Sequence, residues 1–422
     1  MGSYPVLRTL RKAEYAELVV LFFLQGAALS MWFVPLSTVL DANGLHAIKP
    51  FAYAASALAA FISPLIFGAV ADRRVSPARV MRWLSLATAA AMVLASTAIK
   101  LRWNPWLVLA LIQLHAICSA PTFSMAATVV LERVADAQKE FGPIRAMATL
   151  GWMAGCWTVS ALGADTTAVA GYSGAVAWLL AAGFTYFLPK LETPKAAEHL
   201  TWHERLGLDA LTLMRNPDHR VVYLTAALFS IPLAGFYPYA PPHFRVLGLQ
   251  HTTAWMTLGQ VTEIVAMFSL GTLLLRWRLK WIFACGLSFG VLRFALSAFN
   301  TRAFVLAGAL LHGCSFTLVI ITAQIYLDQR VNPAWRARAQ ALLALMISGV
   351  GNLVGYLGTG WWFFACSQSG STPWPRFWAG LAVAAGVVMA YFLMAYHGVG
   401  SGLHPRAAVK EPTRSSPKEL RL

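Results

Sequence analysis

Glu263 is an acidic residue in the middle of an apolar run, residues 253–275, that is long enough to cross a membrane as a helix. At about 1.5 Å of rise per residue, its carboxyl would lie roughly 15 Å deep, near the bilayer midplane. A carboxylate there is costly, so it points to a functional site. Gln260 lies three residues earlier, faces the same way and could hydrogen-bond the same ligand.

Two roles are open for Glu263. Removal from water disfavours the charged carboxylate, so protonation and ligand binding could be coupled at this side chain. The alternative is a structural ion pair with Arg293, which also lies inside an apolar run. Buried ion pairs stabilise proteins poorly, which favours the functional role.

A second group opens another apolar run. Arg145, Thr149 and Trp152 have the spacing i, i+4, i+7 and share one helix face. Together they could offer a cation, a hydroxyl and a stacking ring to one polar ligand. The alternatives are that Arg145 anchors its helix at the membrane interface and that Trp152 only packs.

A third group is His312 and Phe316, four residues apart, with Thr317 next to them. His312 could take a proton or donate to a ligand oxygen, and Phe316 could stack on a base or a sugar. The alternative for His312 is a core histidine with satisfied hydrogen bonds. Four weaker candidates of the same kind are Gln25, Trp32, Gln113 and His115.

These residues require membrane helices to position them. The chain is 58% hydrophobic and 12% charged, with a mean hydropathy of +0.60, whereas soluble domains are about 45–50% apolar. Windows of spanning length fall near residues 16–40, 50–71, 79–98, 105–132, 144–162, 168–188, 219–241, 253–275, 280–299, 303–327, 339–366 and 374–397. We therefore expect an all-α polytopic membrane protein with twelve transmembrane helices in two six-helix bundles.

The expected domains follow from these windows. Residues 1–188 form the first bundle, residues 189–218 a cytoplasmic linker, residues 219–397 the second bundle, and residues 398–422 a basic tail that we expect to be disordered. In the linker, Leu206, Ala210, Leu213 and Met214 have helical spacing, which predicts an amphipathic helix on the membrane face.

The formal net charge of +16 is explained by topology. If the N-terminus is cytoplasmic, 26 of the 33 Lys and Arg residues fall in cytoplasmic segments, as the positive-inside rule requires. Both termini should then be cytoplasmic, and no basic array is left for nucleic acid. We expect a monomer in the lipid bilayer of a bacterial inner membrane.

Metal, redox and enzymatic chemistry has little support in the sequence. The five cysteines are scattered singly, without metal or disulfide spacing. One HxxxH pair, His199 and His203, could hold a metal in the linker, but a solvated helix face explains it more simply. We expect no metal, no cofactor and no enzymatic activity.

Several stretches resemble a known family. Gly68, Asp72 and Arg73 fit the GxxxDR loop motif of the major facilitator superfamily, in which the acid and the cation act at a cytoplasmic gate. The chain further resembles the nucleoside:proton symporters of this superfamily. The stretches that carry the resemblance are residues 141–152, 206–210, 292–296, 313–316 and 331–340.

The resemblance implies a central site that opens alternately to each side of the membrane, with a nucleoside imported alongside protons. Carried over position by position, the family's site comprises Arg145, Thr149, Trp152, Gln260, Glu263 and Phe316. Within it, Glu263 would serve proton coupling or ribose recognition.

The chain departs from the family pattern at five positions. Trp152 replaces a phenylalanine, His312 a tyrosine and Thr317 an aspartate. Ala234 and Tyr237 stand where amide residues are expected on the seventh helix. Two alternatives therefore stay open: another small polar solute, such as a sugar derivative, or an uncoupled nucleoside facilitator.

Overall fold

The structure is a computed structural model. It describes residues 15–71, 76–131, 133–134, 137–188, 201–368 and 372–398. Within these ranges every regular element is a helix, and nine helices are long and apolar enough to cross a membrane. The prediction of an all-α, multi-pass membrane protein is confirmed.

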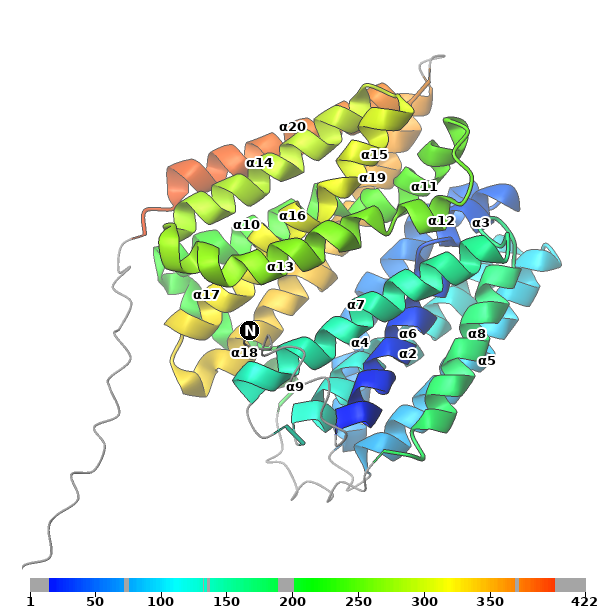
Figure 1. The fold of residues 1–422 in the computed structure, drawn as a ribbon, viewed down its shortest axis with the longest axis horizontal. Coiled ribbons are helices and arrows are strands. Elements are labelled where there is room, and N and C mark those ends of the chain that lie inside the picture. The colour runs from blue at the N-terminus through cyan, green and yellow to red at the C-terminus, as the bar shows by residue number, and fades with distance from the viewer. Residues whose placement is uncertain are drawn as a thin grey trace, which may run out of the picture.

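The helices before the linker pack chiefly on one another, α2 against α7 and α8, α5 against α6 and α8, and α4 against α6. Figure 1 shows them together on one side of the molecule, coloured from blue to teal. Their bounds are α2 Ala16–Phe33, α3 Leu36–Ala42, η2 His46–Ile48, α4 Lys49–Ala71, α5 Pro77–Lys100, α6 Pro105–Leu131, α7 Ala137–Ala161 and α8 Val169–Phe184.

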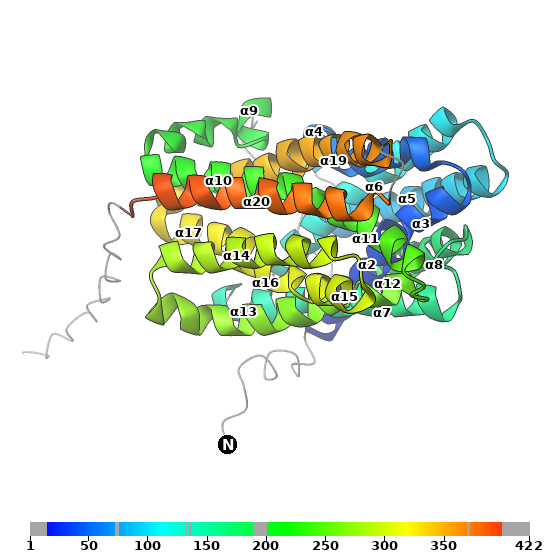
Figure 2. The same cartoon turned by 90° about the horizontal axis from the view of Figure 1, so that it is seen from above.

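The helices after the linker lie on the other side, coloured from green to red (Figures 1 and 2). In this half α14 packs along α20, and α13 packs against α16. The bounds are α10 Pro217–Ala234, α11 Phe236–Val246, α12 Thr252–Trp255, α13 Leu258–Arg276, α14 Leu279–Ala298, α15 Arg302–Leu310, α16 His312–Phe316, η4 Thr317–Ile321, α17 Thr322–Arg330, η5 Pro333–Trp335, α18 Arg336–Ala344, η6 Leu345–Gly351, α19 Asn352–Ser367 and α20 Trp374–Ala395.

Several apolar windows are broken within one span. Pro35 separates α2 from α3 because proline cannot donate the next helical hydrogen bond. Gly235 separates α10 from α11, and the segments η4 and η6 are π-helical turns. Such interruptions at membrane depth are tolerated where they face protein or a cavity, and π-turns are frequent at functional sites.

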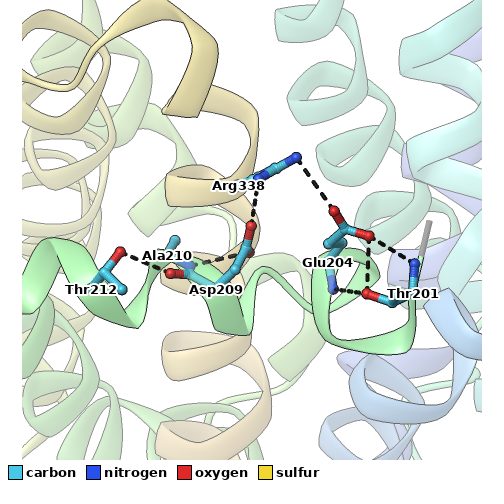
Figure 3. Close-up of polar contacts among 6 residues, drawn as sticks. All are labelled: Thr201, Glu204, Asp209, Ala210, Thr212 and Arg338. Carbon is cyan, nitrogen blue, oxygen red and sulfur yellow. Dashed lines mark hydrogen bonds and ion pairs between the residues drawn. The ribbon is translucent and has the colours of Figure 1, made fainter. Parts of the chain in front are cut away.

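The linker reaches the second half through Arg338, at the start of α18. The linker is split into two short pieces, α9 (Trp202–Arg205) and the 3₁₀ segment η3 (Leu208–Arg215), because Gly207 between them has a left-handed φ of 69°. As Figure 3 shows, Arg338 donates to Asp209 at 2.7 Å and pairs with Glu204 at 3.6 Å. The single amphipathic helix expected here is therefore interrupted.

The end of the molecule that carries α9 and η3 is called the linker end below. At the opposite end, Asp165, after α7, crosses to the second half. Its carboxylate accepts a hydrogen bond from the backbone N–H of Thr253 in α12 at 2.7 Å and from the hydroxyl of Ser160 at 3.0 Å. The Trp157 indole donates to the Thr257 hydroxyl at 3.2 Å. The two halves are thus joined by polar contacts at this end.

Gly151 sets the spacing between α2 and α7. A Cβ atom at this position would collide with the backbone carbonyl oxygen of Phe23 on α2. Only glycine permits so close a crossing, a device that membrane helices commonly use.

Replacing Gly151 with alanine should therefore force α2 and α7 apart. We expect a loss of roughly 1–3 kcal/mol in stability, the usual cost of overpacking. The measurement is the thermal unfolding midpoint of the purified protein in detergent. The matched control is Gly183→Ala on α8, where a Cβ atom meets nothing within 4 Å. Equal midpoints for the two variants would contradict the close crossing.

Candidate functional site

A cavity of about 670 Å³ lies between the two halves. Helices α2, α6 and α7 line it from one half, and α10, α11, α13, α16, η4, α17, α18, η6 and α19 from the other. The lining runs from the middle of the helices to Phe123, Gln324 and Ala344 in the parts nearer the linker end. Its volume is in the usual range for a small-molecule site.

One wall is the face of α7 that carries Arg145, Thr149 and Trp152. All three line the cavity, as their common helix face predicts. The close crossing of α2 and α7 at Gly151 holds this face in place. The Arg145 guanidinium lies 5.6 Å from the ring centroid of Phe123, which also lines the cavity.

The opposite wall is formed by α13 and α16. A Cβ atom at Gly313 would collide with the backbone of Glu263, so these two helices pack with almost no space between them. This contact brings Gln260 and Glu263 of α13 beside His312 and Phe316 of α16, and all four side chains line the cavity.

Glu263 and Arg145 come from different halves, and their opposite charges attract one another across the cavity. Glu263 is half-buried and Arg145 is exposed, so solvent screens part of this attraction. The alternative ion pair of Glu263 with Arg293 is absent from the described residues. The Arg293 guanidinium instead lies 4.1 Å from the Phe236 ring centroid and donates to His312 Nδ1.

One part of the cavity is aromatic. The rings of Phe33, Trp152 and Tyr237 have centroids 5.2–6.1 Å apart. Tyr237 meets the His312 ring at 5.9 Å, nearly at a right angle. Of these rings, Trp152 is on α7. It lies seven residues from Arg145, which is about two helical turns or roughly 10 Å along the helix. The cavity therefore has an aromatic part and a charged part.

Two buried polar atoms at this site have no hydrogen-bond partner among the described residues: the Gln260 side-chain oxygen and the Trp152 indole nitrogen. The Gln260 amide nitrogen donates to the Tyr237 hydroxyl at 3.4 Å. Unsatisfied buried groups are costly, and a polar ligand in the cavity would satisfy them.

Four predicted residues fall elsewhere. Thr317 is fully buried in η4 and is not among the residues that line the cavity. Gly68 lies near the end of α4, and Asp72 and Arg73 lie outside the described residues. The weaker candidates Gln25, Trp32, Gln113 and His115 do not line the cavity either.

Sequence reasoning missed Phe33, Gln324, Ser348 and Asn352, which also line the cavity. Gln324 and Asn352 are polar residues inside apolar runs, so the signal that pointed to Glu263 could also have found them. Phe33 carries no such signal, since one more phenylalanine in an apolar run is ordinary.

A metal site has no support within the described ranges, where no group of three or more His, Cys, Asp or Glu side chains could hold an ion. Of the HxxxH pair, His203 stacks on Trp202, and His199 lies outside the described residues.

Comparison with known proteins agrees with this geometry. Residues 13–399 match the family model described as "Nucleoside H+ symporter". YegT of Escherichia coli (strain K12) is 31% identical over 359 residues, which cover 81% of this chain and 82% of YegT. Nucleoside permease NupG of the same organism is 25% identical, over 90% of this chain and 94% of its own.

The fold is shared with solved structures. A crystal structure of a mutant of nucleoside transporter NupG superimposes with a TM-score of 0.82 at 24% identity, covering 91% of this chain and all (100%) of that chain. The match to the family model spans nearly the whole of the described chain. The chain therefore belongs to the nucleoside H+ symporter family of the major facilitator superfamily, a family of transporters and not of enzymes.

Proposed function

We propose that this protein imports nucleosides together with protons, by alternating access around the cavity between its two halves. One observation carries the proposal: Arg145 and Glu263 face a single cavity from opposite halves, beside a cluster of aromatic rings. The relative NupG is named a nucleoside permease, which supports the same substrate class.

We further propose twelve transmembrane helices in two six-helix bundles, residues 1–188 and 219–397, joined by the linker at 189–218 and followed by the tail at 398–422. Nine candidate spans among the described residues, with α4, α7 and α8, support this number. The basic segments support an orientation with the linker end in the cytoplasm of a bacterial cell and both termini on that side of the inner membrane. The protein would act there as a monomer, surrounded by lipid.

The nucleoside base would stack in the aromatic part of the cavity, between Trp152 and Phe316. Such stacking is worth roughly 1–3 kcal/mol per base. The ribose hydroxyls would then reach Gln260, Glu263 and Arg145, which offer acceptors and donors suited to sugar oxygens. In this arrangement Thr149 completes the polar part.

Glu263 would couple transport to protons. As a carboxylate it would attract Arg145 across the cavity. A proton on Glu263 removes the attraction, so proton binding and the relative position of the halves are linked. Asp72 and Arg73, in the loop motif after Gly68, would act in the cytoplasmic gate.

The first test is uptake of labelled uridine and adenosine by cells that lack their own nucleoside carriers. We expect uptake that a protonophore abolishes and that Glu263→Gln reduces by at least tenfold, because glutamine cannot exchange a proton. The control is Glu17→Gln, since Glu17 lies in an exposed ion pair with Arg133. Uptake insensitive to protonophore would indicate a facilitator, and no uptake of either nucleoside would indicate another polar solute.

Arg145 should contribute to binding by its charge and its hydrogen bonds. We expect Arg145→Gln to weaken nucleoside binding by about tenfold or more, the effect of losing charge-assisted hydrogen bonds. Isothermal titration calorimetry of the purified protein measures this loss. The control is Arg133→Gln, at the same end of the molecule but outside the cavity. Equal nucleoside affinities for the two variants would refute the role of Arg145.

The contact of Asp165 with α12 should hold the end opposite the linker closed. Asp165→Ala removes acceptors for Thr253 and Ser160, a loss of about 1–2 kcal/mol that should increase the fraction of molecules open at this end. Pulsed electron–electron resonance can measure it, in a cysteine-free background, between spin labels at Leu162 and Val246, which are both exposed. Asp328→Ala at the linker end is the control. An unchanged distance distribution in Asp165→Ala would exclude the closing role.

A further inference from the structure

Arg293 is a fully buried cation whose side chain hydrogen-bonds a histidine and not a carboxylate. It lies on α14 with an exposed fraction of 1%. Its guanidinium is 4.1 Å from the ring centroid of Phe236 and 4.8 Å from that of Phe294, so both aromatic faces stabilise its charge. Within the described residues it pairs with no carboxylate, and its side-chain hydrogen bond joins Nη1 to Nδ1 of His312.

This hydrogen bond assigns the tautomer of His312. A guanidinium has only donors, so Nδ1 must be the acceptor and carries no proton. The imidazole is therefore neutral, with its proton on Nε2. In this form His312 can donate a hydrogen bond from Nε2 but cannot accept one there.

The ring that carries this donor is held in one orientation. His312 stacks on Phe236 with centroids 4.6 Å apart and meets Tyr237 edge-on. A Cβ atom at Gly259 would come within 3.1 Å of both Cβ and Cδ2 of His312, so α13 closes the remaining side. His312 lines the cavity, and Nε2 has no hydrogen-bond partner within the described part of the chain.

We propose that His312, positioned by Arg293, is a specificity-determining residue that selects nucleosides whose base carries an oxo group over those that carry an amino group at the same place. The inference rests on the proposed function and adds the class of base. A fixed N–H donor stabilises a carbonyl oxygen, whereas it confronts an amino group with a second donor. Uridine and inosine should thus be preferred to cytidine and adenosine.

The other polar groups of the aromatic part have opposed preferences. The Trp152 indole N–H is a second donor, whereas Gln260, whose amide nitrogen donates to Tyr237, presents its oxygen as an acceptor. Asn352 carries a donor and an acceptor on one amide, so it serves either kind of base by rotating. The Tyr237 hydroxyl can likewise donate or accept.

Glu263 lies beside His312, since a Cβ atom at Gly313 would collide with the Glu263 backbone. As a carboxylate it would favour an amino group, whereas a protonated carboxyl can donate to an oxo group. His312 is therefore the group on this wall that donates whether or not Glu263 carries a proton.

The test compares matched substrate pairs. Uridine and cytidine differ in the oxo or amino group at one ring carbon, and inosine and adenosine differ in the same way. For each pair the ratio of kcat/KM values is measured by uptake in cells without other nucleoside carriers. We expect the oxo substrate to be preferred about tenfold, because a site built for one hydrogen-bonding pattern leaves the mismatched group unpaired.

Two variants locate the source of the preference. His312→Gln should bring both ratios close to one, because the glutamine amide can present either group. Arg293→Met should also lower them, since His312 then keeps its ring but is free to change tautomer. The control is His243→Gln. His243 is an equally buried histidine, held by Trp378 and Asn300 and outside the cavity lining, so its variant should keep the ratios of the unmodified protein.

The outcomes separate the inference from the function on which it rests. Equal uptake of both members of each pair by the unmodified protein would overturn the selection but leave nucleoside import intact. Absence of uptake of all four nucleosides would overturn the import itself. Unchanged ratios in His312→Gln would overturn the role of His312. Thermal unfolding in detergent shows whether Arg293→Met folds, and if it does not, His312→Gln decides.

Discussion

The structure depends on shielding charged side chains at the depth of a membrane's hydrocarbon core, where an unpaired charge costs several kcal/mol. Two solutions occur side by side. Arg145 and Glu263 face the cavity and each other's charge. Arg293 is enclosed instead by aromatic faces and the nitrogen of a neutral histidine. Both solutions need helices that approach closely, which the glycines at the α2–α7 and α13–α16 crossings allow.

The contacts that join the two halves differ from those inside each half. Most of each apolar core lies within one half, with Trp178 in one core and Trp378 in the other. A few residues cross over: Val34 and Cys156 join the core of the second half, and Ala234 and Tyr356 that of the first. Between the halves, at the end opposite the linker, the contacts include hydrogen bonds of Asp165 and Trp157. A hydrogen bond contributes only about 1 kcal/mol net, far less than a packed apolar core. Such an arrangement suits halves that remain folded while the contacts between them change.

Nine of the apolar windows coincide with helices long enough to cross a membrane in the described residues, because the hydrocarbon thickness dictates a length that an apolar run reveals. Glu263 was found for the same physical reason, since one acid in such a run is conspicuous. The partner of Arg293 could not be predicted from the sequence. An ion pair with Glu263 was open there, whereas in the structure the guanidinium hydrogen-bonds His312. Thr317 was expected at the site from the resemblance, yet the π-turn that begins there buries its side chain. Pairings of this kind depend on helix rotation, which spacing along one helix does not determine.

The pairing of Arg293 with His312 also bears on which side chain of the cavity carries a proton and which recognises the base. A histidine beside a cavity is the usual candidate for carrying a proton, but one that accepts a hydrogen bond from a buried guanidinium is held neutral. Among the described residues that line the cavity, Glu263 is then the one carboxyl group left to carry a proton. Proton coupling and base recognition would thus belong to different side chains on neighbouring helices, so a change in the base could alter the affinity without altering the coupled proton. The replacement of a tyrosine, which can donate or accept, by a histidine that only donates fits a protein that keeps the family's coupling and narrows its choice of base.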